Sequence, residues 1–457
     1  MNTSSRLARL KKLLPGEISL APARLAEYAG DKWFAAHTPD AVALPRSAGA
    51  VSRILAFANE NRIPVTARGA GHGYVGGCVP IRGGIALSTE RMNRILEINR
   101  GDFVAVVQPA VITAKLQAET ERRKLFYPPD PASRADNFIG GNIATNAGGP
   151  RCLKYGVTRD YVLGLQVVLA DGTILRTGGR THKNKTGFDL TKLFVGSEGL
   201  LVVITEATLK LIPLPPFRAT LAVGFNSMRA AAGALRGILA GGFLPSALEL
   251  ADEFTLAAAA KYTGDNRLGV CKAHLIVEMD GQRDSVRGEI PAVENVIRRF
   301  KPLFIEHGFG DAECEKIWQI RRVFSTSLKS TGLKKLNEDI VVPRGRLEDL
   351  FRFTARLQKK IDLPIACFGH AGDGNIHVNI MLDRNDAAAV RRGEAALDDL
   401  FRQVIAWKGA ITGEHGIGLA KMRWWPLAVS EEVRDLHFSV KHLLDPHGIL
   451  NPGKFVE

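Results

Sequence analysis

The chain has 457 residues, of which 46% are hydrophobic and 24% are charged, and its formal net charge is +14. This length exceeds what one hydrophobic core supports, so we expect two or three domains in a globular protein. No run approaches the roughly 20 apolar residues of a membrane-spanning helix. The basic residues are spread along the chain without aromatic residues interleaved among them, so we expect no nucleic-acid partner.

The N-terminal segment 1–17 alternates leucine with arginine and lysine, which predicts a short amphipathic helix. The helix lies on the protein surface or contacts an anionic membrane, and both interpretations stay open. The segment has no apolar core followed by a small-residue cleavage site, so we expect no secretory signal. We therefore expect a cytoplasmic protein, with the inner face of the membrane as an alternative location.

The five cysteines are widely scattered, and no CxxC motif occurs among them. This pattern disfavours zinc ribbons, iron–sulfur clusters and disulfide scaffolds. We expect a reducing compartment.

The first glycine-rich loop follows a short helix and a short strand. Residues 50–61 have apolar side chains at helical spacing, and residues 63–67 have the pattern of a strand. The loop RGAGHGYVGG at 68–77 contains a literal GxGxxG, yet Pro80 and further glycines follow where a Rossmann fold needs a helix. We therefore reject a nicotinamide site and interpret the loop as a backbone cradle for an anionic ligand, with Arg68 beside it. Glycines that only serve turns are the alternative for this loop taken alone.

Two more segments rich in small residues follow. Residues 113–125 predict a helix with Thr113 as its cap. The stretch 127–150 holds two glycine pairs framed by Asn and Thr, which suits the close approach of a phosphorylated or heteroaromatic ligand. A DG pair at 171–172 predicts a hairpin, and GSEG at 196–199 opens a turn and a strand. Three such loops between strands imply an extended ligand.

A second group of chemically active residues lies in IACFGHAGDGNIHVNIM at 365–381. A DG pair between two apolar runs predicts a hairpin, with His370 before its turn and His377 after it. Side chains alternate along a strand, so His377 and Asn379 share one face. With Glu414 from the later GEHGIG loop, two imidazoles and a carboxylate could converge on a metal ion. A hairpin with two hydrogen-bonded histidines is the alternative for this segment alone.

The order of these motifs resembles that of a known family. RGAGHGYVGG, YPPDPAS, GGNIATNAGG, KYGVTRDYV and GSEGLLVVITEATLKL are followed by GHAGDGNIHVN, TGEHGIG and LDPHGILNPGK. This order, over residues 37–457, is similar to that of FAD-dependent 2-hydroxyacid dehydrogenases of the vanillyl-alcohol oxidase and p-cresol methylhydroxylase (PCMH) superfamily. The nearest resemblance is to the branch that contains the FAD-dependent chain of glycolate oxidase and the D-lactate dehydrogenases.

The resemblance implies an α+β fold in three segments. Residues 1–215 would form a two-subdomain FAD-binding domain of the PCMH type. Residues 216–400 would form an α+β cap domain with an antiparallel sheet, which holds the substrate and a metal ion. Residues 401–457 would return to the FAD-binding domain.

The resemblance also implies roles for individual residues. The FAD contacts would be Arg68, Gly69, Ala70, Gly71, His72, Gly73, Pro129, Asp130, Ser133, Gly140, Gly141, Thr145, Asn146, Gly199, Ile204 and Asn451. The metal ligands would be His370, His377 and Glu414, binding zinc, manganese or iron. The catalytic residues would be His415 as the base, Arg321 and Asn379 at the substrate carboxylate, and Lys335 as a second cation.

The implied reaction is oxidation of a small 2-hydroxy acid, of the D-lactate, glycolate or D-2-hydroxyglutarate type, to the 2-oxo acid, with hydride transfer to FAD N5. A divalent ion chelated by the substrate hydroxyl and carboxylate would lower the hydroxyl pKa and fix the direction of the α-hydrogen. The pKa of a histidine lies near neutrality, which suits His415 as the base. The sequence does not specify the substrate side chain.

His72 departs from the family pattern, because many members of this branch carry a non-nucleophilic residue at this loop position, and it stands four places after Arg68. In the berberine-bridge type of the same superfamily, a histidine at this spacing bonds covalently to the flavin 8α-methyl group. Two interpretations stay open: a covalent FAD through His72, and a histidine that hydrogen-bonds near the pyrophosphate.

The chain lacks iron–sulfur cysteines, so reduced flavin must pass its electrons to oxygen, a quinone, an electron carrier or another subunit. The alternatives to a self-sufficient enzyme are a flavin subunit that is active only with an iron–sulfur or electron-carrier partner, and a non-catalytic flavin-binding homologue. We expect a homodimer or a hetero-complex, and peripheral membrane association stays open.

Overall fold

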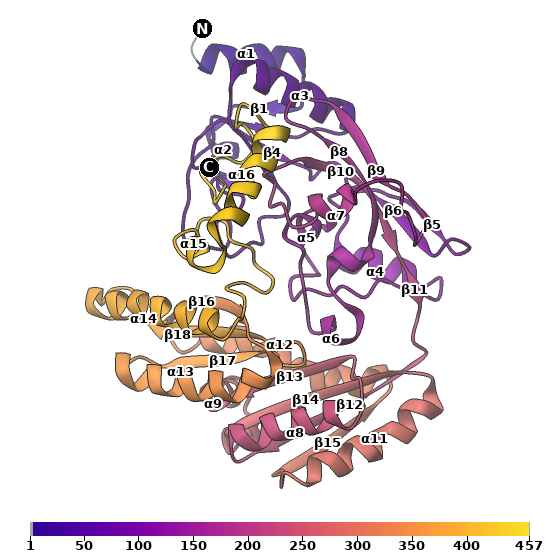
Figure 1. The fold of residues 1–457 in the computed structure, drawn as a ribbon, viewed down its shortest axis with the longest axis vertical. Coiled ribbons are helices and arrows are strands. Elements are labelled where there is room, and N and C mark those ends of the chain that lie inside the picture. Colours follow the sequence, from indigo (N-terminus) through magenta and orange to yellow (C-terminus); the bar gives the residue numbers. More distant parts are fainter. Residues whose placement is uncertain (1–2, 457) are drawn as a thin grey trace. The chain divides into compact units, whose positions relative to one another are not determined.

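The computed structural model describes residues 3–456, and the chain forms two compact units (Figure 1). The first unit contains the chain up to Gly148, Val157–Leu214 and the chain from Glu414 onward. The second unit contains Gly149–Gly156 and Pro215–Gly413. The second unit is therefore inserted between segments of the first.

Two sheets and a short strand pair build the first unit. The four-stranded sheet has the order β1-β2-β4-β3, with strands β1 (Ile18–Ser19), β2 (Ala41–Ala43), β3 (Val65–Arg68) and β4 (Ile85–Ser88). The five-stranded antiparallel sheet has the order β5-β6-β10-β8-β9, with strands β5 (Ile95–Asn99), β6 (Val104–Val107), β8 (Val162–Val168), β9 (Ile174–Gly178) and β10 (Val203–Lys210). The short pair is β7 (Leu125–Phe126) with β11 (Ile212–Pro213). The predicted hairpin at 171–172 is confirmed by the pairing of β8 with β9.

The helices of the first unit are α1 (Thr3–Leu13), α2 (Pro22–Glu27), α3 (Ala48–Asn61), α4 (Thr113–Glu121), α5 (Ile139–Thr145), α7 (Leu190–Phe194), α15 (Trp425–Ala428) and α16 (Glu431–Leu444), with the 3-10 turn η1 (Thr158–Tyr161). Leu7 and Leu10 of α1 are buried in one cluster with Val51, Ile54 and Leu55 of α3, so the helical spacing seen in both segments is confirmed. None of the helices within residues 3–456 combines the length and apolar character that crossing a bilayer requires.

The chain after the first glycine loop continues without a helix into β4, which confirms that the loop does not belong to a Rossmann fold. Thr113, in contrast, does not cap α4, because the helix already begins at this residue. Its hydroxyl donates to Asn137 Oδ1 at 2.6 Å and accepts from Asn142 Nδ2 at 2.8 Å. The predicted cap is therefore wrong: Thr113 instead joins a buried polar network beneath the second glycine-rich segment.

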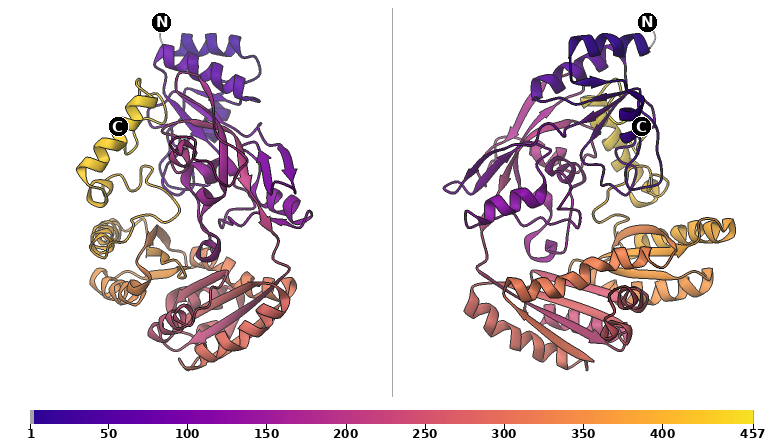
Figure 2. Two further views of the ribbon diagram at one scale, coloured as in Figure 1. Left: turned by 45° about the vertical axis from the view of Figure 1, so that its right-hand side comes forward. Right: turned by 180° about the vertical axis from the view of Figure 1, so that it is seen from behind.

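A seven-stranded antiparallel sheet forms the centre of the second unit, with helices packed on it (Figures 1 and 2). Its order is β15-β12-β14-β13-β17-β18-β16, with strands β12 (Phe217–Phe225), β13 (Ala247–Asp252), β14 (Ala273–Gly281), β15 (Phe304–Phe309), β16 (Lys334–Val341), β17 (Ile365–His370) and β18 (Asn375–Leu382). The helices are α6 (Cys152–Tyr155), α8 (Met228–Ala240), α9 (Glu253–Thr263), α10 (Asn266–Gly269), α11 (Arg283–Arg298), α12 (Asp311–Lys329), α13 (Leu347–Ile361) and α14 (Ala387–Ala406), with the 3-10 turn η2 (Arg344–Arg346).

The predicted hairpin is confirmed as β17 and β18, and its turn requires a glycine. Gly374 has a φ of +90°, and an added Cβ would lie 2.1 Å from the Val342 carbonyl oxygen. The register pairs His377 with Phe368 in β17 and with Asp339 in β16. Pairing with a strand on each side therefore fixes which side chains of β18 point to each face of the sheet.

One face of the sheet, here called the site face, is polar over strands β13, β17, β18 and β16. Strand register and alternation place on it Glu249, His370, His377, Asn379, Lys335, Asn337 and Asp339. Beside these, an apolar cluster that includes Phe368 and Met381 packs against α9 and α12. The opposite face carries α14, where an added Cβ on Gly393 would meet Leu336 and Leu382.

Candidate functional site

The end of β3 and the loop after it hold six of the residues predicted to contact FAD, from Arg68 to Gly73. Arg68 Nη1 donates to the Gly30 carbonyl at 2.6 Å, and the guanidinium lies 5.3 Å from the centroid of the Tyr28 ring. Gly71 has a φ of +70°, and a side chain there would collide with Arg68. The arginine therefore fixes the loop, and the glycine leaves room for it.

His72 in this loop has a buried Nδ1 atom that finds no hydrogen-bond partner within residues 3–456. Burial, followed by the positive charge of Lys32, lowers the pKa of His72. The imidazole is therefore biased towards its neutral form.

The second predicted FAD segment packs against the first. An added Cβ on Gly69 would lie 3.5 Å from Gly141 Cα, so the first loop and the start of α5 touch through residues without side chains. At Gly141 itself an added Cβ would meet nothing within 4 Å, so its backbone is open to a ligand. An added Cβ on Gly140 would lie 2.6 Å from Pro109 Cβ, which requires glycine there.

The remaining predicted residues of this segment are held by local hydrogen bonds. The Pro129 carbonyl accepts from Gln117 Nε2 at 3.0 Å, Ser133 Oγ accepts from Asn137 Nδ2 at 3.0 Å, Thr145 Oγ1 donates to the Gly141 carbonyl at 3.2 Å, and Asn146 ends α5 with a φ of +51°. Ala70 and Asp130 lie in the same two loops, whereas Ile204 is paired with Val167 inside the five-stranded sheet. The predicted residues thus all belong to the first unit.

Asn451 joins three segments of the first unit. Its backbone N–H donates to the Val65 carbonyl at 2.7 Å, and its Nδ2 donates to the carbonyls of Gly77 at 2.9 Å and Glu198 at 2.8 Å. The side chain is buried, yet Oδ1 has no hydrogen-bond partner among the described residues. A buried acceptor of this kind is expected to receive a ligand N–H, so the site fits a heteroaromatic cofactor such as a flavin.

Glu198, in the GSEG motif beside Gly199, is a site residue that the sequence did not assign. Its half-buried carboxylate accepts from the backbone N–H groups of Ile417 at 2.8 Å and Gly418 at 2.9 Å. Burial raises the pKa of Glu198. The carboxylate thereby holds the GEHGIG loop, and His415 in this loop lies with its ring centroid 5.2 Å from that of Tyr74, within the first glycine loop. The predicted base is thus next to the predicted FAD loop.

The site face of the second unit brings the two predicted metal-binding histidines together. The rings of His370 and His377 have centroids 5.7 Å apart at an interplanar angle of 81°. Buried Glu249 lies between His370 and Arg321: Oε1 is 2.6 Å from His370 Nδ1, and Oε2 accepts from Arg321 Nε at 2.5 Å. Burial acts to raise the pKa of Glu249, but the charges of His370 and Arg321 outweigh it and lower the pKa.

Asp339, on the neighbouring strand β16, holds the chain that leads to Glu414. It is buried opposite His377, and its Oδ2 accepts from the Gly413 backbone N–H at 2.8 Å. Thr412 Oγ1 donates to the same carboxylate at 3.3 Å. Glu414 directly follows Gly413 in the sequence.

Two other predicted residues lie on the same face. Lys335 Nζ donates to Ser325 Oγ at 2.9 Å, and burial, together with Lys329, lowers the pKa of Lys335 to about 8. Asn379 is buried and its Nδ2 donates to the Ala366 carbonyl at 3.2 Å. Its Oδ1 is buried without a hydrogen-bond partner in the described chain, so the amide presents an acceptor.

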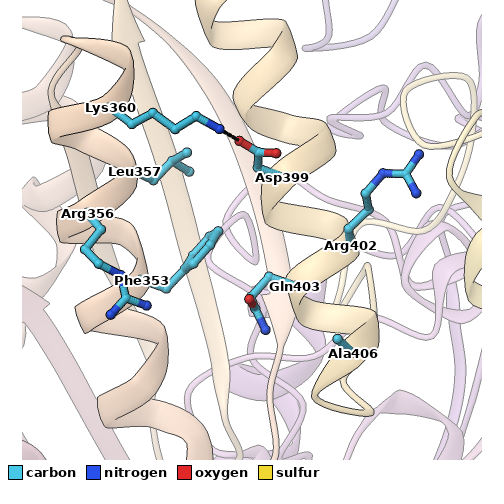
Figure 3. A pocket seen from close by; sticks show the side chains of 8 residues that line it. All are labelled: Phe353, Arg356, Leu357, Lys360, Asp399, Arg402, Gln403 and Ala406. Carbon is cyan, nitrogen blue, oxygen red and sulfur yellow. Dashed lines mark hydrogen bonds and ion pairs between the residues drawn. The ribbon is translucent and has the colours of Figure 1, made fainter.

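A hollow of about 570 Å³ lies elsewhere in the second unit, between α13 and α14 (Figure 3). Lys360 and Asp399 form an ion pair of 2.7 Å across it, and Arg356 and Arg402 also line it. None of its lining residues is a predicted site residue. It is a groove between helices, separate from the site face.

The fold defines the class of protein. The 4-ethylphenol oxidase from Gulosibacter chungangensis and p-cresol methylhydroxylase both align with a TM-score of 0.81 over 99% of this chain and 96% of theirs, at 20% and 19% identity. The chain therefore has the PCMH-type flavoprotein fold, and the predicted α+β class is confirmed.

Sequence comparison gives the family. A model described as "FAD binding domain" matches residues 39–178, and one described as "FAD linked oxidases, C-terminal domain" matches residues 214–455. The chain belongs to the FAD-linked oxidases and is an FAD-dependent oxidoreductase, so the family resemblance seen in the motifs is confirmed.

Several curated relatives match almost the whole chain. Glycolate oxidase subunit GlcD of Bacillus subtilis is 39% identical, covering 91% of this chain and 88% of its own. The subunit of the same name in Escherichia coli K12 is 35% identical over 99% of this chain and 91% of its own. D-lactate dehydrogenase of Anaerostipes hadrus is 30% identical over 99% of this chain and 97% of its own.

The link from Asn451 to bound flavin can be tested by the Asn451→Ala variant. The change leaves the Gly77 and Glu198 carbonyls without their donor, so we expect a loss of about 1–3 kcal/mol in the free energy of unfolding and a reduced FAD content per chain. The measurements are chemical denaturation and the ratio of flavin to protein absorbance. The control is Asn61→Ala, which removes a 2.8 Å bond from Nδ2 to the Phe57 carbonyl in α3 and should leave FAD content unchanged. Full FAD content in Asn451→Ala would contradict the assignment.

Proposed function

We propose that the protein oxidises a small 2-hydroxy acid to the corresponding 2-oxo acid, with bound FAD as the hydride acceptor. The observation that carries the proposal is the site face, where two histidines, two cations and a buried amide acceptor occupy adjacent strands and the helix packed on them. The names of the relatives, glycolate oxidase subunit and D-lactate dehydrogenase, support the same substrate class.

In this proposal Arg321 and Lys335 bind the substrate carboxylate. The Nε of Arg321 is occupied by Glu249, while its two Nη groups have no hydrogen-bond partner within the described residues. A guanidinium whose side chain is only 13% exposed, and which keeps two such donors, suits a carboxylate ligand. Asn379 contributes the acceptor Oδ1, so we assign it to the substrate hydroxyl side of the ligand.

We propose that His370, His377 and Glu414 hold a divalent ion, for which zinc, manganese and iron all fit the donor set. A bound ion supplies a Lewis acid that lowers the pKa of a coordinated hydroxyl. Glu249 and Asp339 support the assignment, because they fix His370 and the chain leading to Glu414. His415, adjacent to Glu414, accepts the hydroxyl proton in this proposal.

FAD supplies the hydride-accepting N5 position when bound. We propose that the loop from Arg68 and the segment around Gly141 hold its pyrophosphate, and that Asn451 and Gly199 contact its rings and ribose. His72 lines this site without a covalent bond.

We expect acid-precipitated protein to release its flavin into solution, since a hydrogen-bonded histidine does not retain it. Yellow colour that stays in the pellet, and that is lost in His72→Ala, would instead show covalent attachment.

We further propose that reduced flavin passes electrons to a partner subunit. Two of the relatives are named as subunits of a glycolate oxidase, and the five cysteines of this chain include no CxxC motif for an iron–sulfur cluster. A chain that oxidises substrate in one turnover but needs an added acceptor for many turnovers fits this role.

Anaerobic mixing with D- and L-2-hydroxy acids tests the proposed reaction, with flavin bleaching as the readout. We expect one enantiomeric series to bleach the flavin. The His415→Ala variant should bleach about 10²–10⁴-fold more slowly, the usual contribution of a general base, with FAD still bound. The control is His442→Ala, which replaces an exposed histidine on α16 and should match the wild type.

Prolonged EDTA treatment should slow bleaching, and zinc, manganese or ferrous iron should restore it.

These measurements separate the parts of the proposal. If no 2-hydroxy acid bleaches the flavin, the substrate class is wrong. Wild-type rates in His415→Ala would remove His415 as the base. Unchanged rates in metal-stripped protein would make His370, His377 and Glu414 structural.

The lowered pKa of Lys335, about 8, gives a pH prediction. Its ammonium is charged below this pH and neutral above it, so the KM for substrate should rise about tenfold or more as the pH passes 8, the loss expected for one charged contact. Lys335→Arg keeps its charge and should abolish this dependence.

The deprotonation of Lys335 that weakens substrate binding has the opposite effect on the stability of the fold. Between pH 8 and the ordinary lysine pKa of 10.5, the unfolded chain holds a proton that the folded chain has lost, so the free energy of unfolding should rise with pH. Lys335→Met removes this contribution. A wild-type KM that stays constant through pH 8 would exclude Lys335 from carboxylate binding.

A further inference from the structure

Glu249 connects two groups to which the proposed function gives different tasks. It lies on β13, 1% exposed, and no charged side chain of its own strand neutralises it. Its two oxygens are bonded to His370 Nδ1 on β17 at 2.6 Å and to Arg321 Nε on α12 at 2.5 Å. One carboxylate therefore reaches a proposed metal ligand and the proposed carboxylate-binding cation.

The bond to Glu249 decides which nitrogen of His370 carries the proton. Glu249 forms an ion pair with Arg321, so its two carboxylate oxygens accept hydrogen bonds and His370 Nδ1 is the donor in the 2.6 Å contact. The remaining ring nitrogen, Nε2, then has the lone pair that coordination to a metal ion needs. Carboxylates that hold ligating histidines in this way also raise the basicity of the imidazole.

The same carboxylate fixes the orientation of Arg321. A guanidinium bonded through Nε presents its Nη edge as a pair of parallel donors, which matches the two oxygens of a carboxylate. The Arg321 guanidinium carbon also lies over the Phe368 ring, 5.0 Å from its centroid, and over the Phe324 ring, 5.8 Å from its centroid, so two aromatic faces contact the cation.

We propose that Glu249 is a positioning residue that couples metal binding to substrate-carboxylate binding. It holds His370 as the Nδ1–H tautomer and holds Arg321 by Nε, so that the metal ligand and the anion-binding donors keep a fixed separation. The inference rests on the proposed function, because it takes from it the roles of His370 and Arg321.

The Glu249→Gln variant tests this role because glutamine keeps the shape but offers only one oxygen. Its amide NH₂ must face either Arg321 Nε–H, which repels it, or His370 Nδ1, which then becomes an acceptor and moves the ring proton to Nε2. We expect the Zn²⁺ dissociation constant of the metal-stripped, FAD-loaded protein to rise about 10-fold to 100-fold, as for other residues that orient metal ligands. The readout is competition with a chromophoric chelator.

Glu278→Gln is the matched control. Glu278 is a buried glutamate on the neighbouring strand β14, and it is likewise paired with an arginine, Arg218, at 3.0 Å. It also accepts from the Trp318 indole N–H at 2.7 Å. Its replacement should lower stability as Glu249→Gln does, while leaving Zn²⁺ affinity within about twofold of the wild type, since no ligand histidine contacts it.

Cobalt substitution provides a second readout, which can be recorded on the wild type as well as on the variants. In Co²⁺-loaded wild-type protein, an Nε2-bound histidine with Nδ1–H gives a hyperfine-shifted proton signal that disappears in D₂O, and its hydrogen bond to Glu249 slows exchange with solvent. We expect this signal in the wild type and in Glu278→Gln, and its loss in Glu249→Gln. Glu249→Asp, which keeps the charge but shortens the side chain, should bind Zn²⁺ with intermediate affinity.

The outcomes distinguish this inference from the proposed function. Tight Zn²⁺ binding by the wild type together with equal affinity in Glu249→Gln would overturn the role of Glu249 and leave the metal site standing. Absence of stoichiometric Zn²⁺ binding in the wild type would overturn the metal part of the proposed function, and the role of Glu249 with it. If Glu249→Gln does not fold, two other measurements test the role of Glu249. Wild-type Zn²⁺ affinity in Glu249→Asp would overturn this role. Absence of the exchangeable proton signal in Co²⁺-loaded wild-type protein would also overturn it.

Discussion

Charge buried inside a sheet must be paired, and this constraint organises the second unit. Glu249, Glu278 and Asp339 are all buried on its strands, and each is bonded to donors from another element. Leaving such a carboxylate unpaired costs several kcal/mol, so its partners have little freedom to move. The partners of Glu249 and Asp339 include a proposed metal ligand, a proposed substrate-binding cation and the chain next to Glu414. Because these partners must stay in place to pair the buried charges, the groups that would act on a substrate are held in fixed positions.

The same constraint holds the C-terminal part of the first unit. Lys441 is buried, and its ammonium donates to the carbonyls of Leu200 at 2.8 Å and Leu450 at 2.7 Å while pairing with Asp445 at 2.5 Å. Asp445 in turn accepts from the backbone N–H groups of Ile449 and Leu450. The turn before Asn451 is therefore built from charged groups that are saturated by the backbone, and this places the Asn451 amide among the glycine-rich segments.

Local patterns predicted the parts of the structure that local forces determine. The hairpin of β17 and β18 follows from a DG turn and alternating side chains, and Pro80 excluded a helix after the first glycine loop. Glu249 had no such signal, because its partner His370 is 121 positions away in the sequence. The predicted Thr113 cap was wrong because the partner of its hydroxyl, Asn137, is 24 positions away in the sequence and is brought close only by the tertiary fold. Family resemblance supplied the roles of the individual site residues, and all of these roles stay predictions.

The route of the chain through the two units has a consequence for biosynthesis. The second unit uses only residues before Glu414, so all of it is synthesised before the last segment of the first unit. The first unit, in contrast, takes Ile449 and Leu450 into its core and pairs Leu450 with Val65 of β3. The core around its early strands is therefore incomplete until Ile449 and Leu450 have been synthesised. The proposed FAD site, which includes Asn451, can likewise be completed only after this residue has joined the segments of Gly77 and Glu198.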